Sequence, residues 1–270
     1  MGHMICLASN KGGTGKTTLT VNLAAALANR GHRVLVVDID SQCNSTRTLF
    51  GRERPETSLY DIFKGKDGGE VDVDSCIHPT NHKNVFILPN TPATALTEHK
   101  FYATTPKSYL NLKIAIRDFV LARYDFIILD TPPNLGFFLI SSLMCADIAL
   151  IPVECASQYS LDGLRHLIAF VEKITEQNKN LDQIRIILNM ADKRTSASRS
   201  KIDLVQHRYK DFVAESIIPH STAIAQAEIS RSSVLKVAKA GPAANAFRAL
   251  AQEVEALVGV SRDGEAITTE

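Results

Sequence analysis

Short runs of large apolar residues recur along the chain without polar alternation, which predicts strands buried on both faces of a sheet. Segments with helical periodicity follow several of these runs, as after residue 18 and around residues 110–121. Strands that alternate with helices predict an α/β fold, a doubly wound, mostly parallel sheet with helices on both faces. The strands are expected at residues 5–8, 33–38, 85–89, 126–130, 146–153, 185–190 and 212–218.

The remaining segments set the expected limits of this fold. We interpret residues 1–3 as an expression remnant and residues 4–258 as a single domain that ends in a helix. Residues 93–102 are a candidate helix within an irregular, turn-rich part of the chain. The polar and acidic residues 259–270 are expected to form a disordered tail.

A glycine-rich loop lies between the first predicted strand and the first predicted helix. Glycine lets backbone N–H groups approach a phosphate, and the helix that follows adds free donors and the positive end of its dipole. Lys16 is expected to reach the β- and γ-phosphates of a nucleotide, and the Thr17 hydroxyl to bind Mg²⁺. The alternative is a glycine-rich turn with a surface lysine. The nucleotide-binding residues predicted in this loop are Gly12, Gly13, Thr14, Gly15, Lys16, Thr17 and Thr18.

Two of the predicted strands end in acidic residues. The strand at 126–130 ends in Asp130, the arrangement in which a buried strand delivers one carboxylate to Mg²⁺, here through metal-bound water. The strand at 33–38 ends in Asp38, and Asp40 follows closely. Carboxylates at this edge lie beside the phosphate loop in such folds. Helix caps or solvated turn residues are the alternative for Asp38 and Asp40.

The loop departs in one place from the common G-x-x-x-x-G-K pattern. Asn10 stands where the first glycine is expected, and Lys11 follows it. The box Lys-Gly-Gly-x-Gly-Lys-Thr-Thr at residues 11–18 resembles the deviant Walker A box of the ParA/MinD family of dimerising ATPases. In that family the early lysine crosses to the nucleotide of the other subunit. The resemblance therefore implies a homodimer around ATP, with a Lys11 that points into solvent as the alternative.

Two further segments resemble the same family. Residues 38–44 match its Asp-x-Asp-Pro-Gln-x-Asn, with Ser41 in place of the proline, and residues 130–136 match its Asp-x-Pro-Pro-x-Leu-Gly. The resemblance implies that Asp40 orients the attacking water and that Asp38 supports the Mg²⁺ shell. A carboxylate suits the first role because a water nucleophile must be held in line with the γ-phosphate.

The resemblance is tight over residues 5–47 and 126–165 and diffuse elsewhere. It implies that Asn189, at the end of a predicted strand, contacts adenine, with an asparagine in a tight turn as the alternative. The backbone of Pro219, at the end of the next strand, is expected to border the same base.

Charge adds one candidate partner. The formal net charge of +1 excludes a global attraction to nucleic acid, but residues 191–239 hold nine basic residues against five acidic ones. Such a stripe binds phosphate backbones without reading sequence, although solvated helix faces carry similar charge. ParA-type ATPases bind double-stranded DNA non-specifically as ATP dimers, which strengthens the first interpretation. The candidate DNA contacts are Arg194, Arg199, Lys201, Arg231 and Lys236.

Several features separate the branches of the family. The acidic tail is a poor match for anionic lipid, and no apolar run approaches the roughly 18 residues of a membrane span. The five cysteines form no C-x-x-C pair, so we expect buried thiols and no iron–sulfur site. No helix-turn-helix segment precedes the loop. What remains resembles the short ParA/Soj branch.

The expected function is that of an ATP- and Mg²⁺-dependent partition ATPase. It would bind DNA as an ATP dimer and be released when a ParB-like or other cargo adaptor stimulates slow hydrolysis, segregating plasmid, chromosome or protein cargo. We expect a cytoplasmic, nucleoid-associated protein without membrane binding. The alternatives are a MinD-like membrane-cycling ATPase and a small-molecule P-loop enzyme, such as a kinase or an amide-forming synthetase.

Overall fold

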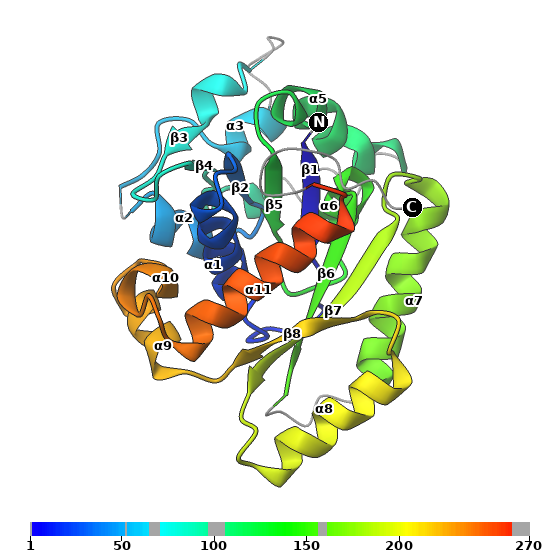
Figure 1. Cartoon of the computed structure of the whole chain (residues 1–270). Coiled ribbons are helices and arrows are strands. Elements are labelled where there is room, and N and C mark those ends of the chain that lie inside the picture. Colours follow the sequence, from blue (N-terminus) through cyan, green and yellow to red (C-terminus); the bar gives the residue numbers. More distant parts are fainter. Residues whose placement is uncertain (1, 52, 65–70, 97–105, 156–160, 261–270) are drawn as a thin grey trace.

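An eight-stranded sheet runs through the molecule in the order β3-β4-β2-β5-β1-β6-β7-β8 (Figure 1). All neighbouring strands are parallel except β3 and β4, which are antiparallel. The computed structural model describes residues 2–51, 53–64, 71–96, 106–155 and 161–260. The strands are β1 (His3–Leu7), β2 (Val34–Asp38), β3 (His78–Pro79), β4 (Val85–Leu88), β5 (Phe126–Asp130), β6 (Ile148–Glu154), β7 (Gln183–Ala191) and β8 (Val213–Pro219).

Helices cover both faces of this sheet, as predicted for a doubly wound fold (Figure 1). The helices among the described residues are α1 (Lys16–Asn29), α2 (Asn44–Leu49), α3 (Leu59–Lys64), η1 (Asp74–Cys76), η2 (Pro106–Leu110), α5 (Asn111–Leu121), α6 (Phe137–Cys145), α7 (Leu161–Gln177), α8 (Ser196–Arg208), α9 (Thr222–Ile229), α10 (Val234–Val237) and α11 (Pro242–Leu257). No helix in these parts of the chain is long and apolar enough to span a bilayer.

The unbroken apolar runs fill two core layers because successive side chains of a strand point to opposite faces. In β5, Phe126 and Ile128 pack under α1 and α11, whereas Ile127 and Leu129 pack under α3, α5 and α6. Farther along the sheet, α6, α7 and α8 cover this second face over β6 and β7. Burial on both faces explains why these strands lack polar alternation.

Element boundaries and burial refine several predictions. β1 begins at His3, so the strand includes a residue of the segment that we interpreted as an expression remnant. The helix predicted around residues 110–121 buries Leu112, Ile116 and Val120, because positions four apart share a helix face. Ile114 lies between them along the chain and is 78% exposed. All five cysteines are buried and free, as predicted.

Two predictions fall on residues outside the described ranges. The candidate helix at 93–102 is described only up to residue 96, and the predicted tail only up to residue 260. The short strand β3 and several helices of the described chain were not predicted, namely α2, α3, η1, η2, α6, α8, α9 and α10.

The topology gathers the predicted site at one edge of the sheet. β1 lies between β5 and β6, while the chain continues from β1 through α1 to β2 on the far side of β5. The strand order reverses direction at β1, and ligands of such folds bind beyond the carboxyl ends of the strands at this point. The glycine loop, Asp38 and Asp130 all follow from strands that end there.

Candidate active site

The loop between β1 and α1 turns at two glycines. Gly13 and Gly15 have φ of 77° and 82°, in the left-handed region that favours glycine. Among the described residues, nothing lies within 4 Å of the point where a Cβ would stand on Gly13. A Cβ on Gly15 would instead lie 2.4 Å from Nδ2 of Asn189 in β7. The loop is therefore open to a ligand at Gly13 and packed against the sheet at Gly15.

The first turn of α1 offers an anion site. α1 begins at Lys16, its first turn holds no acidic residue, and no side chain of the described residues caps it. The first N–H groups of such a helix lack intrahelical acceptors and lie at the positive end of its dipole. Together with the open face at Gly13, this arrangement fits the phosphate groups of a nucleotide.

Lys16 lies deep in this site, at 8% exposure. Burial lowers the pKa of its ammonium group, and the nearby carboxylates of Asp130 and Asp40 oppose that shift. The structure therefore brings together the predicted phosphate-binding lysine and two of the predicted acids.

Asp130 receives two hydroxyl donors on one oxygen. Thr17 Oγ1 donates to Asp130 Oδ2 at 2.8 Å, and Ser45 Oγ donates to the same atom at 2.6 Å. The other oxygen, Oδ1, is buried and has no partner among the described residues. Sequence reasoning missed Ser45, which has no motif signal beyond its place just after the acidic segment.

Asp38 is held next to Asp130 by the pairing of β2 with β5. Its Oδ2 accepts hydrogen bonds from the backbone N–H of Thr46 at 2.8 Å and from Thr46 Oγ1 at 2.6 Å. Burial and the adjacent Asp130 raise the pKa of Asp38, and burial also raises the pKa of Asp130. Two buried carboxylates on paired positions of neighbouring strands favour a nearby cation.

The donor set fits Mg²⁺. Hydroxyl and carboxylate oxygens are the ligands that Mg²⁺ prefers, and Asp130 Oδ1 is a buried oxygen that lacks a partner within the described chain. No cluster of three or more His, Cys, Asp or Glu side chains suited to a metal occurs in the described ranges. The site therefore matches an ion held by a few protein oxygens and by substrate phosphates, as is usual for Mg²⁺.

Asp40 differs from the other two acids because a small part of it is exposed, whereas Asp38 and Asp130 are almost fully buried. It is 8% exposed, and its Oδ1 accepts a hydrogen bond from the backbone N–H of Gln42 at 2.9 Å. Its own N–H donates to Asp38 Oδ1 at 3.2 Å. Asp40 therefore lies near Lys16, and its other oxygen, Oδ2, accepts no hydrogen bond from the described residues and can accept one from a water molecule.

Lys11 is paired within its own subunit. Its Nζ lies 3.6 Å from Oε2 of Glu154, at the end of β6, and its side chain is 44% exposed. Glu154 had no signal in the sequence, because an acid that ends a strand is common. If Lys11 is to contact the nucleotide of another subunit, as predicted, its ion pair with Glu154 must break. Breaking an ion pair at the surface costs little free energy.

Asn189 braces the loop. Its Nδ2 donates to the backbone carbonyl of Thr14 at 2.8 Å, and its Oδ1 accepts from the N–H of Met190 at 2.9 Å. A groove of about 700 Å³ opens beyond the ends of β7 and β8, lined by Asp192, Pro219 and their neighbours. Of the two predicted adenine contacts, Pro219 lines this groove, whereas Asn189 is buried beside the loop in a structural contact that sequence reasoning missed.

The five candidate DNA contacts do not form one patch. Arg194 donates to both carboxylate oxygens of Asp192 at 2.9 Å, and Arg199 lies on α8. Burial lowers the pKa of Lys201, whose charged neighbours include Glu154 and Lys11 of the loop region. Lys236, on α10, donates to the carbonyl of Asn81. Helices α8 and α10 lie well apart in Figure 1.

Arg231 lies apart from the other candidates. It lines a cavity of about 400 Å³ together with Thr17 and Thr18 of the first turn of α1. The placement brings it next to the predicted phosphate site.

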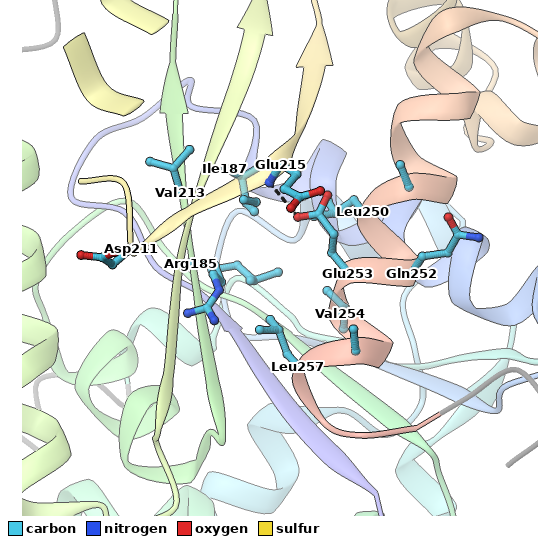
Figure 2. A pocket seen from close by; sticks show the side chains of 14 residues that line it. Arg185, Ile187, Asp211, Val213, Glu215, Leu250, Gln252, Glu253, Val254 and Leu257 are labelled. Carbon is cyan, nitrogen blue, oxygen red and sulfur yellow. Dashed lines mark hydrogen bonds between the residues drawn. The ribbon is translucent and has the colours of Figure 1, made fainter. Parts of the chain in front are cut away.

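A further cavity, of about 600 Å³, lies between β7, β8 and α11 (Figure 2). Glu253 of α11 points toward Glu215 of β8 and accepts a hydrogen bond from its backbone N–H at 2.9 Å. Arg185, near the start of β7, lines the same cavity, whereas the glycine loop packs near the end of β7 at Asn189. This cavity is therefore separate from the candidate active site.

Comparison with known proteins matches most of the chain. A family model described as an AAA domain matches residues 2–184. The sporulation initiation inhibitor protein Soj of Bacillus subtilis (strain 168) is 35% identical over 260 residues, which cover 95% of this chain and 99% of that protein. The chromosome-partitioning ATPase Soj of Thermus thermophilus is 33% identical over 255 residues, which cover 94% and 96% of the two chains.

A solved structure adds a bound nucleotide to the comparison. The septum site-determining protein MinD from Pyrococcus horikoshii OT3, complexed with Mg-ADP, is 25% identical and has a TM-score of 0.75. The match covers 96% of this chain and 98% of that one.

Proposed function

Because the chain belongs to the ParA/MinD family of P-loop ATPases, we propose that it closes into a homodimer around ATP and binds double-stranded DNA in that state. It is an ATPase of the partition or positioning type, with ATP and Mg²⁺ as its ligands. In the proposed cycle, a ParB-like or other cargo adaptor stimulates slow hydrolysis and releases the dimer from nucleoid DNA in the cytoplasm. The cargo is a plasmid, a chromosome or a protein assembly.

The main support for this cycle is that the extra lysine, Lys11, occurs in the same chain as a set of residues suited to hydrolysis. Lys16 and the free N–H groups of α1 hold the phosphates, and Lys16 offsets their charge. Thr17 and Asp130 would hold Mg²⁺, supported by Asp38 on the neighbouring strand, and the bound ion would neutralise charge on the nucleotide phosphates. Asp40 orients the attacking water through its free oxygen. Gly12, Gly13, Thr14, Gly15 and Thr18 complete the phosphate loop.

Dimer formation is proposed to exchange the partner of Lys11. In the single chain its ammonium pairs with Glu154 at 3.6 Å. The phosphates of a nucleotide on the facing subunit carry more negative charge than the Glu154 carboxylate. They would also lie in a site with less water, where the attraction between opposite charges is stronger than at the surface. Asn189 and Pro219 are proposed to border the adenine, and Pro219 lines the groove at the ends of β7 and β8.

The DNA contacts are proposed to come from Arg194, Arg199 and Lys201, in and just before α8, together with Lys236. The separation of α8 and α10 favours a surface that is completed by the second subunit (Figure 1). Contacts of this kind are made to phosphates, so binding is expected to be insensitive to sequence and to weaken steeply with salt.

A binding experiment with a random-sequence duplex tests the proposal. We expect binding with ATP, but not with ADP or without nucleotide, and a loss of affinity between low and moderate salt. Arg194→Ala and Lys236→Ala should weaken this binding, whereas Arg248→Ala, on α11, is the matched control. Absence of binding in every nucleotide state would contradict the DNA step, and vesicle pelleting would then test for a membrane.

A further inference from the structure

We infer that Arg231 binds the phosphates of the nucleotide and adds a positive charge beside the first turn of α1. The inference rests on the proposed nucleotide site at Lys16 and Thr17. It assigns to Arg231 a role different from the DNA contact that the charge pattern predicted.

The backbone at Arg231 has a conformation that suits glycine. Its φ is 49°, and it follows the last turn of α9. The N–H of Ser232 donates to Ala227 O at 2.9 Å, and the N–H of Arg231 donates to Glu228 O at 3.0 Å. This pair of bonds is the Schellman ending of a helix, in which the left-handed residue is usually glycine because a Cβ is strained there. An arginine at this position is therefore held at a conformational cost.

The arginine stands at a cavity that reaches the phosphate loop. The cavity, of about 400 Å³, lies between α1, α2 and the end of α9. Its walls include Thr17 and Thr18, which belong to the turn of α1 that offers free N–H groups to an anion. Arg231 lines this cavity and is half-buried, so the site is partly shielded from water. Shielding strengthens its attraction to a phosphate.

The charges around the cavity favour an anion. Among the described residues that line it, Arg231 and Arg47 are the two cations, and their guanidinium groups have no hydrogen bond or ion pair with other described residues. Glu228 is the one acid among the same residues, and its carboxylate already accepts a hydrogen bond from the Thr18 hydroxyl. The two cations therefore outnumber one acid that is already occupied. Because the cavity adjoins the nucleotide loop, the nucleotide phosphates are the anion that the geometry offers.

Replacing Arg231 with glycine separates two effects: the strain of the left-handed backbone and the contribution of the positive charge to nucleotide binding. Arg231→Gly should raise the midpoint of urea unfolding, because it relieves the left-handed strain. It should also weaken the binding of ATP and ADP by about tenfold, measured by titration with fluorescent nucleotide analogues. Arg231→Gln keeps a side chain on the strained backbone, and it should lose the same affinity without gaining stability.

A second left-handed residue provides the matched control. Asn84, in the turn between β3 and β4, has φ of 63° and lies outside the cavity. Asn84→Gly should leave nucleotide affinity unchanged. Wild-type nucleotide affinity in Arg231→Gly and Arg231→Gln would overturn the inference, and a loss of DNA binding alone would return Arg231 to the DNA surface. Lys16→Ala tests the nucleotide site itself, because wild-type ATP affinity in that variant would overturn the proposed function as well.

Discussion

Three aspartates at the ends of neighbouring strands differ in the contacts that hold them. Asp130 accepts two hydroxyl donors, and Asp38 is tied to Thr46 by two hydrogen bonds. The Asp40 carboxylate accepts only the N–H of Gln42 among the hydrogen bonds seen in the described residues. The first two are therefore suited to hold a metal in place, and Asp40 retains an oxygen for a water molecule.

Asp40→Asn tests the assignment of the water. The amide oxygen still accepts the hydrogen bond from Gln42, so the loop should fold and bind ATP with unchanged affinity. Phosphate release should fall by about 100-fold or more, because the water loses its orienting carboxylate. Asp118→Asn, on the exposed side of α5, is the control. Normal turnover in Asp40→Asn would show that Asp40 is structural.

Among the elements, the strand–loop–helix unit depends on a strand that is distant in the chain. The glycine loop follows β1, but it is held by a hydrogen bond from Asn189, at the end of β7, to the carbonyl of Thr14. A Cβ on Gly15 would meet that same amide at 2.4 Å. The third glycine of the box is thus required for packing as well as for its backbone angle.

Gly15→Ala tests the link between the loop and β7. It should lower stability and weaken ATP binding at least tenfold, because the methyl group displaces Asn189 from the loop. Gly31→Ala is the control, since Gly31 has φ of 101° and no atom of the described residues lies within 4 Å of the point where its methyl group would stand. It should lose about 1–2 kcal/mol of unfolding free energy from strain while it keeps its ATP affinity. Equal ATP affinities in the two variants would contradict the role of the contact.

Across the molecule as a whole, a buried acid joins the last described helix, α11, to the segment between α1 and β2. Glu255, on α11, is 3% exposed and accepts hydrogen bonds from Arg30 at 2.6 Å and from His32 at 2.7 Å. Arg30 and His32 lie between α1 and β2, so the contact fastens the last helix to the unit that carries the phosphate loop. Removing one partner of such a group leaves the other charge buried and unpaired.

Glu255→Gln should therefore lower the unfolding free energy by roughly 3 kcal/mol at pH 7. Burial opposes the charge on Glu255, but the hydrogen bonds from Arg30 and His32 prevail and hold its pKa below the usual value. A lowered pKa favours the folded state above the ordinary pKa of 4.5, and this contribution is lost as the pH falls through the lowered value. Urea unfolding at pH 7, 5 and 3.5 should show the difference from wild type shrinking in acid.

The control for this prediction is Glu176→Gln, on the exposed side of α7. It should change stability by less than about 0.5 kcal/mol at every pH. A pH-independent loss in Glu255→Gln would show that packing, rather than the charge, fastens α11.

The class of fold and the centre of the site could be predicted from the amino-acid sequence alone. Unbroken apolar runs mark buried strands because both faces of those strands are covered, and such runs ending in Asp38 and Asp130 mark the carboxyl edge. The glycine box is equally local, since its backbone angles and its chemistry are encoded by neighbouring residues.

The identity of the distant residues that meet at that centre depends on the tertiary fold. Strand order places Asn189 against Thr14, Glu154 against Lys11, and Arg231 beside Thr17 and Thr18. Hydrophobic periodicity indicates that a strand is buried, but it does not indicate which strand lies next to it. Contacts between residues of different strands therefore leave no pattern along the chain. The charge count of residues 191–239 likewise could not show that α8 and α10 lie well apart in the fold, or that Arg231 lines a cavity together with Thr17 and Thr18.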